Sequence, residues 1–169
     1  MTNRYPDQRI LAIDLRTRRF GYAVFESPLH LLDWGATSYP SDVQEGPKEA
    51  RRRFRKLLKL FDPSAVILRA MRGKDRSVAL LFEAIQNEAF SRQVPIRIIK
   101  RLDNPTVFQG KGNDDTASAL AERYPELLWK LPPKRKAWES ERHNMIVFCA
   151  ITAGLAYLQN DEAARFSAE

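Results

Sequence analysis

Residues 10–26, ILAIDLRTRRFGYAVFE, contain the pattern that decides the fold. Residues 9–15 form a short apolar run that ends at charged residues, which is typical of a buried strand. In residues 20–26 the side-chain character alternates along the chain, and aromatic and β-branched residues are frequent, so this stretch predicts a second strand. The linker between the two predicted strands is short, which favours a hairpin. Residues 29–38 predict a third strand, and three consecutive strands indicate an antiparallel meander.

After the third strand, the apolar residues recur with the period of a helix. Residues 50–61 have one apolar and one basic face, and the position before Pro63 is expected to end this helix because it avoids helical angles. We expect Ser77 to cap the next helix, and Asn113 or Asp114 to cap a later one. The elements predicted after residue 38 are a helix over 50–61, a strand over 65–68, a helix over 78–89, a strand over 96–100, a short helix that ends by 123 and a helix over about 140–158.

This order of elements predicts an α/β fold, and with Asp14 at the end of the first strand it resembles the fold of the RNase H-like superfamily. Its mixed five-stranded sheet has three antiparallel and then two parallel strands, with helices on its faces. Right-handed crossovers make the last two strands parallel to the first, so the carboxyl ends of these strands share one edge, where ligands usually bind. We expect a single domain over residues 1–160 and a polar tail over residues 161–169.

The composition favours a polyanionic partner. Lys and Arg number 28 against 21 Asp and Glu, which gives a net charge of +7. The single cysteine, Cys149, excludes an internal disulfide framework and fits a reducing compartment. Apolar runs such as residues 145–150 are too short to cross a bilayer. We therefore expect a cytoplasmic protein that binds nucleic acid, most simply DNA, and no membrane.

Two stretches resemble the RuvC branch of the RNase H-like superfamily. Residues 10–26 look like that family's first-strand aspartate followed by a second strand with Gly-Tyr, and residues 105–120, PTVFQGKGNDDTASAL, look like its glycine-rich loop and following helix. The resemblance covers residues 10–158. It implies an endonuclease that cleaves branched or structured DNA such as Holliday junctions, with Mg²⁺ or Mn²⁺ as cofactor and a homodimer as one possible assembly.

The implied chemistry needs carboxylates that hold two divalent ions. Asp14 matches the family's first acid, and a buried acid at a strand end is costly unless it is used or paired. The second acid, a glutamate at the end of the fourth strand, is replaced by Arg69, which cannot bind a cation. Three other acids could substitute for it or could be ordinary solvated side chains: Asp75, Glu83 and Asp103.

The family's remaining acids lie three residues apart near the start of the last helix. Glu141 and Asn144 match these positions and share a helical face, although Asn144 offers only a neutral oxygen. His143 is adjacent and could act as a metal ligand or a general base. The alternatives stay open, because an acid favours the first turn of any helix and a histidine there can be a surface residue.

A further group of residues is expected to contact nucleic acid. Arginine binds phosphate well, and basic residues follow the fourth strand at the predicted binding edge. In the glycine-rich loop, Lys111 offers an ammonium group and Asn113 a backbone N–H, although Thr116 takes the family's lysine position. The residues that follow the fourth strand are Arg69, Arg72, Lys74 and Arg76. The basic face of residues 51–59 could run along a phosphate backbone, but a solvated helix surface is the simpler interpretation. The tryptophans, including Trp129, are assigned to the core or a lid.

Two functions remain after other chemistries are excluded. The sequence has no P-loop, no dinucleotide fingerprint, no zinc-spaced cysteines and no nucleophile elbow. The first function is a RuvC-like endonuclease in which Asp14, Glu141, Asn144 and Asp103 hold Mg²⁺ and His143 assists. The second is a catalytically degenerate member that binds nucleic acid or a protein partner without cleavage.

Overall fold

The computed structural model describes residues 8–71, 75–100, 112–133, 136 and 144–167. The strands are β1 (Ile10–Leu15), β2 (Arg19–Ser27), β3 (His30–Ser38), β4 (Ala65–Arg69) and β5 (Ile96–Ile99). The helices are α1 (Glu45–Phe61), α2 (Arg76–Ser91), α3 (Asn113–Arg123), the 3-10 helix η3 (Pro125–Lys130) and α4 (Met145–Ser167). The predicted order of strands and helices is confirmed, with η3 as an addition.

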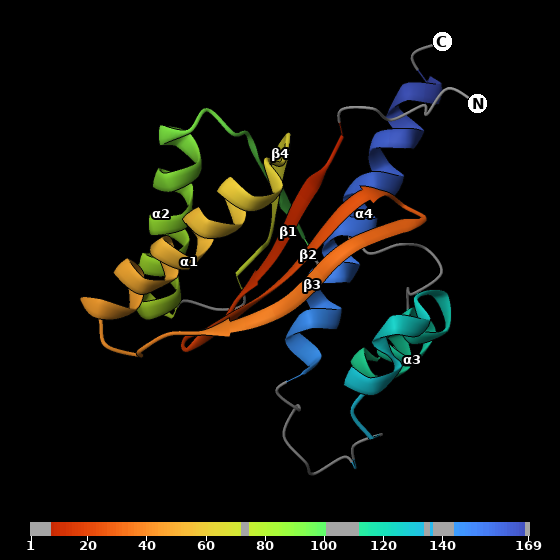
Figure 1. Ribbon diagram of the computed structural model, residues 1–169, viewed down its shortest axis with the longest axis horizontal. Coiled ribbons are helices and arrows are strands. Elements are labelled where there is room, and N and C mark those ends of the chain that lie inside the picture. The colour runs from red at the N-terminus through yellow and green to blue at the C-terminus, as the bar shows by residue number, and fades with distance from the viewer. Residues whose placement is uncertain (1–7, 72–74, 101–111, 134–135, 137–143, 168–169) are drawn as a thin grey trace.

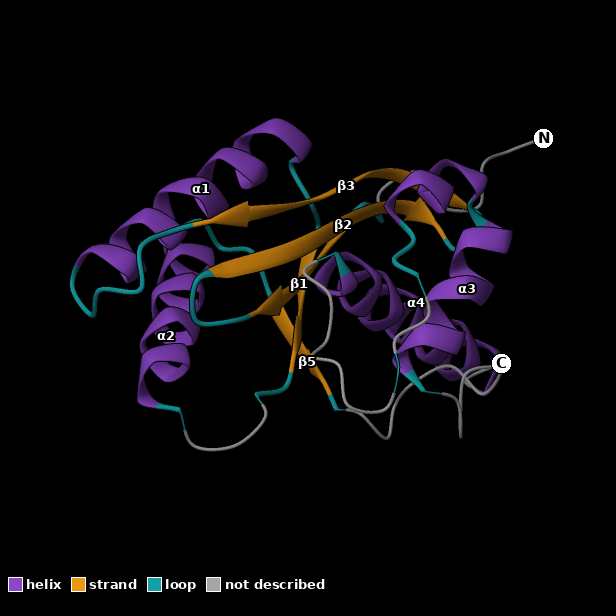
Figure 2. Cartoon of the chain, turned by 90° about the horizontal axis from the view of Figure 1, so that it is seen from below, coloured by secondary structure: helices purple, strands orange, loops and turns teal. Residues whose placement is uncertain are grey.

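The five strands form one mixed sheet in the order β3-β2-β1-β4-β5. The pairs β1–β2 and β2–β3 are antiparallel, whereas β1–β4 and β4–β5 are parallel. The predicted α/β fold, with a meander followed by two crossover strands, is therefore confirmed. Helices α1 and α2 cover one face of the sheet, and α4 and α3 lie on the other (Figures 1 and 2).

The central strand β1 is buried on both faces, so its side chains divide between two cores. Ile10 and Ala12 belong to the cluster that includes α4, and Leu11 and Ile13 to the cluster that includes α1 and α2. Burial on both faces explains why β1 is a nearly continuous apolar run. The same alternation places Asp14 on the α4 side of the sheet.

Helix α4 lies very close to the sheet at two glycines. A Cβ atom at Gly21 would stand 2.4 Å from the backbone oxygen of Ile146, and one at Gly154 would stand 2.5 Å from Cε2 of Phe25. No side chain fits at either position without moving the helix. Gly21 pairs with Asp14 in the β1–β2 register, so the first turn of α4 packs beside the strand that carries Asp14.

The helix ends partly differ from the expectations. Helix α1 ends at Phe61 as predicted, and Asp62 adopts a left-handed conformation with φ of 45°. The cap predicted at Ser77 is wrong, because the Asp75 carboxylate two residues earlier accepts the Ser77 N–H at 2.8 Å and caps α2. Gly112 is the N-cap of α3, so neither Asn113 nor Asp114 has that position.

Helix α4 extends to Ser167, beyond the predicted end near residue 158. Within the described ranges, no helix combines the length and the apolar character needed to cross a membrane. The division into a domain of residues 1–160 and a tail of residues 161–169 stays a prediction.

Candidate functional site

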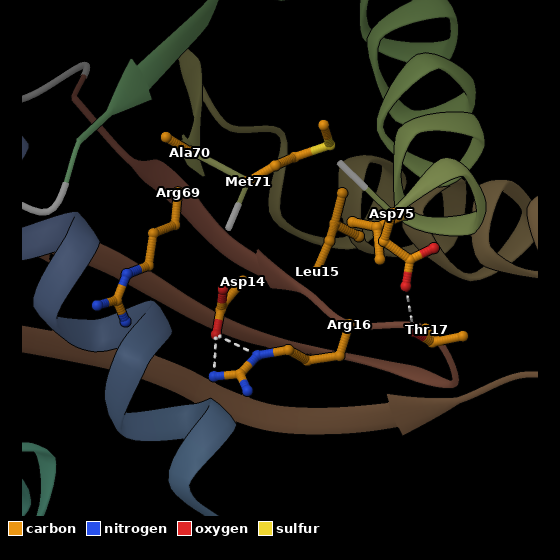
Figure 3. A pocket seen from close by; sticks show the side chains of 9 residues that line it. Asp14, Leu15, Arg16, Thr17, Arg69, Ala70, Met71 and Asp75 are labelled. Atoms are coloured by element: carbon orange, nitrogen blue, oxygen red, sulfur yellow. Dashed lines mark hydrogen bonds and ion pairs between the residues drawn. The ribbon is translucent and has the colours of Figure 1, made fainter. Parts of the chain in front are cut away.

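A cleft lies where β1 and β4 end side by side (Figure 3). The parallel register pairs Ile13 with Leu68, so the next residues, Asp14 and Arg69, are neighbours across the two strands. By strand alternation both side chains face α4. The cleft has a volume of about 180 Å³, and its polar lining residues are Asp14, Arg16, Thr17, Arg69 and Asp75. The predicted meeting of Asp14 and Arg69 at one edge is therefore observed.

The Asp14 carboxylate is paired with the guanidinium of Arg16. Nε and Nη2 of Arg16 both lie 3.1 Å from Oδ2 of Asp14, whose side chain is only 9% exposed. Nη2 also donates to the sulfur of Cys149 on α4 at 3.8 Å. Arg16 therefore connects the end of β1 to α4. The carboxylate that was predicted to bind a cation has a protein cation beside it.

Tyr39 holds the hairpin turn from which Arg16 projects. Its buried hydroxyl lies within donating distance of two main-chain carbonyls, that of Arg16 at 2.5 Å and that of Arg19 at 2.9 Å. Its N–H also donates to the carbonyl of Arg18 at 2.8 Å. Burial and the negative charge of Asp14 raise the pKa of Tyr39, so the hydroxyl keeps its proton and continues to donate. Sequence reasoning missed Tyr39, because this contact joins residues 20 or more positions apart.

Arg69 differs from Arg16 in having no anionic partner. Among the described residues, no hydrogen bond or ion pair is made by the Arg69 side chain, which is partly exposed. Figure 3 shows its guanidinium beside α4, on the same side of β1 as Asp14. An unpaired guanidinium at the mouth of a cleft attracts an anion and repels a metal ion.

Asp75 lines the opposite side of the cleft but serves mainly as a helix cap. Its Oδ1 accepts the Ser77 N–H at 2.8 Å, and its Oδ2 accepts the Thr17 hydroxyl at 3.5 Å. Both carboxylate oxygens therefore have a partner. Glu83, the other nearby substitute considered from sequence, is exposed on α2.

Three of the other predicted site residues lie within the described part of the chain, at the starts of three helices. Asn144 is exposed just before α4, and its Nδ2 donates to the carbonyl of Lys130 at 3.2 Å, so its amide contacts η3. Asn113 is the first residue of α3, and Arg76 is the exposed first residue of α2. The remaining predicted residues lie outside the described residues: Glu141, His143, Asp103, Arg72, Lys74 and Lys111.

The described part of the cleft does not fit a two-metal centre. Such a centre needs several converging carboxylates, and here Asp14 is paired with Arg16 and the neighbouring cleft residue on β4 is the cation Arg69. Within the described ranges, no three His, Cys, Asp or Glu side chains are grouped so that they could hold a metal. A set that combines Asp14 with Glu141, Asn144 or Asp103 stays a prediction.

The basic face of α1, interpreted from the sequence as a solvated surface, is largely neutralised by ion pairs within the protein. Arg51 and Arg55 bind the buried carboxylate of Glu88 on α2, with shortest N–O distances of 2.7 Å. Arg52 and Arg53 bind Glu49. The positive charge on α1 therefore consists mainly of paired residues, in contrast to Arg69.

Trp129 does not lie in the core, so of the two places expected from the sequence, core or lid, the core is wrong. Within η3, Leu127 is fully buried whereas Trp129 is 72% exposed. A 3-10 turn places one residue in three on the same side, so the contact of Leu127 with the core turns Trp129 outward. Trp34 is partly buried against the α4 core, as expected. Trp138 lies outside the described residues.

Comparison with known proteins finds similarity at the level of structure. No protein-family model matches the sequence, and no curated protein matches it. Several structures of Holliday junction resolvases match most of the chain. Thermus thermophilus RuvC in complex with a Holliday junction matches with a TM-score of 0.66 and 16% identity over 92% of this chain and 96% of that one.

Two further resolvases match with lower scores. The fowlpox virus resolvase, bound to its junction substrate, gives a TM-score of 0.57 and 12% identity over 89% of this chain and 99% of that one. The yeast mitochondrial resolvase gives a TM-score of 0.52 and 15% identity, and the match covers 94% of this chain and 80% of that one. The chain therefore has the RuvC-type, RNase H-like fold.

Proposed function

We propose that this protein binds branched DNA at the cleft between β1 and β4, through the guanidinium groups of Arg69 and Arg16. The observation that carries the proposal is the side chain of Arg69, which lies beside Asp14 and has no ionic or hydrogen-bond partner within the part of the chain that the structure describes. A phosphate placed in the cleft would gain a charge-assisted, bidentate partner there. Such contacts to phosphate provide most of the affinity of proteins for DNA.

Arg16 can take part by exchanging one anion for another. Its side chain is about one-third exposed and lines the cleft, so an incoming phosphate can approach it without opening the core. In the absence of DNA, Asp14 holds the guanidinium of Arg16 in place at the cleft. Asp14 then acts as an internal substitute for phosphate, and Tyr39 keeps the turn that carries Arg16 in position.

The fold supports branched DNA as the substrate class. Thermus thermophilus RuvC and the fowlpox virus resolvase were both solved with Holliday junction DNA, and each resembles this chain over about nine-tenths of its length. A shared fold alone does not transfer an activity. The supporting feature of this chain itself is that its unpaired arginine lies at the sheet edge where ligands of α/β proteins usually bind.

The test is a binding assay that compares a four-way junction with a linear duplex of the same length. Arg69→Gln is expected to weaken junction binding about ten-fold, and to reduce the slope of log affinity against log salt by about one. The matched control is Arg53→Gln on α1, which removes an equal charge that is paired with Glu49, and it should leave the affinity unchanged. Equal losses in the two variants would show that only net charge matters, and the cleft would not be the binding site.

Metal-dependent cleavage is the second candidate, and the position of Asp14 favours it. Asp14 is a buried acid at the carboxyl end of the first strand, where the RuvC resemblance implies the first metal ligand. Glu141, Asn144 and Asp103 would complete the set for Mg²⁺ or Mn²⁺, with His143 as a further ligand or general base.

Junction cleavage with Mg²⁺ or Mn²⁺ tests this candidate. If the protein cleaves, Asp14→Asn should abolish cleavage and Arg69→Glu should increase it, because the second change supplies the missing acid. Cleavage that survives in Asp14→Asn would exclude Asp14 as an essential ligand. A homodimer and a cytoplasmic location remain predictions of the sequence.

A further inference from the structure

Trp129 is an exposed aromatic side chain that no core contact explains. It is 72% exposed, and the Nζ atom of Lys130 lies 4.5 Å from the centroid of its ring. The other cation–π contact among the described residues involves Tyr124, which is buried and has no open ring face. Trp129 and Lys130 therefore present an indole and an ammonium group together on the surface.

This pair is connected to the start of α4, whose first turn packs beside the strand that carries Asp14. The carbonyl of Lys130 accepts a hydrogen bond from Nδ2 of Asn144, and the carbonyl of Asn144 accepts from the N–H of Val147 in the first turn of α4. The intervening residue Ile146 packs over Gly21, which pairs with Asp14. Three short connections thus link η3 to the strand that ends in the cleft.

We propose that Trp129 stacks on an unpaired base of the DNA held at the cleft, while Lys130 contacts a neighbouring phosphate. This inference rests on the proposed function and adds to it a preference for branch points with unpaired nucleotides. Stacking on an indole needs an accessible base face, which paired and stacked bases do not offer. The adjacent ammonium favours a polyanionic chain over an uncharged apolar partner.

The experiment compares a fully paired four-way junction with the same junction carrying two unpaired nucleotides at the branch point, one of them 2-aminopurine. The wild-type protein should bind the second junction more tightly and quench its fluorescence, because stacking changes the emission of the base analogue. Trp129→Leu should lower affinity for that junction roughly ten-fold and remove the quenching, with little effect on a linear duplex. Trp129→Phe, which keeps a ring, should restore part of both signals.

Two controls separate this inference from folding and from the proposed function. Phe90→Leu removes another exposed ring, 86% exposed on α2 on the other face of the sheet, and should change neither affinity nor quenching. If Trp129→Leu keeps wild-type affinity and quenching while Arg69→Gln still weakens binding, the stacking proposal is wrong and the cleft proposal stands. An equal loss for all three DNAs in Trp129→Leu would also overturn stacking on an unpaired base.

Discussion

Glu88 and Asp14 are both buried carboxylates bound by arginine, but they differ in how they are enclosed. Glu88 lies between α1 and α2, and Arg51, Arg55 and Arg92 donate to its two oxygens at 2.7 to 3.1 Å. Asp14 lies on the other face of the sheet, at an open cleft that also contains the unpaired Arg69. The Glu88 cluster connects two helices, whereas the Asp14 pair leaves guanidinium groups where a ligand can reach them.

The largest expected effect is on stability, at Glu88. Glu88→Ala should lower the free energy of unfolding by about 3 kcal/mol, because it leaves three arginine side chains without their common anion. Urea denaturation monitored by circular dichroism measures this change. Junction affinity of the folded variant should stay the same. A loss of DNA binding without a loss of stability would contradict the structural role assigned to Glu88.

Acid should weaken the same cluster. The hydrogen bond from Arg55, followed by those from Arg51 and Arg92, lowers the pKa of Glu88 from 4.5 to about 2. A lowered pKa means that this stabilisation is complete above pH 4.5 and is lost as the pH falls toward 2. The unfolding free energy measured between these pH values should therefore fall less steeply in Glu88→Gln. Parallel profiles for the two proteins would show that Glu88 is not the titrating group.

Asp14→Asn should change DNA affinity and leave stability nearly the same, which is the reverse of the effect expected for Glu88→Ala. Removing the charge weakens the attraction that Asp14 exerts on the guanidinium of Arg16 and so favours its contact with phosphate, and junction affinity should rise about three-fold, on the order of 0.7 kcal/mol. Stability should change little, because the side chain of Arg16 is 36% exposed and can be hydrated. Titration of a labelled junction measures the affinity. Weaker binding in Asp14→Asn would mean that Asp14 orients Arg16 for DNA instead of competing for it.

The smallest expected effect on DNA affinity is at Tyr39. Tyr39→Phe removes the hydroxyl that lies within donating distance of the carbonyls of Arg16 and Arg19, which should lower the unfolding free energy by about 1 kcal/mol. Junction affinity should fall less than two-fold, since Arg16 loses its fixed turn but keeps its charge. Thermal unfolding and the binding assay measure the two quantities. An unchanged melting temperature would show that the turn is held by its backbone contacts alone.

The sheet could be predicted from sequence because its signals are local. Alternation in residues 20–26 and the helical period of residues 50–61 depend on neighbouring positions, and the crossover rule then placed Asp14 beside Arg69. The partner of Asp14 could not be predicted, because Arg16 lies in a turn whose conformation depends on a contact with Tyr39, about twenty residues away. The exposure of Trp129 depends on which residue of η3 faces the core, and composition does not reveal this.

The close packing of α4 on the sheet does not depend on which side chains line the cleft. At Gly21 and Gly154 there is room only for a hydrogen atom on Cα, so the distance between α4 and β2 is fixed by direct contact. Substitutions inside the cleft, such as an arginine in place of an acid, leave that spacing intact. The scaffold can therefore exchange one set of cleft residues for another while its architecture persists.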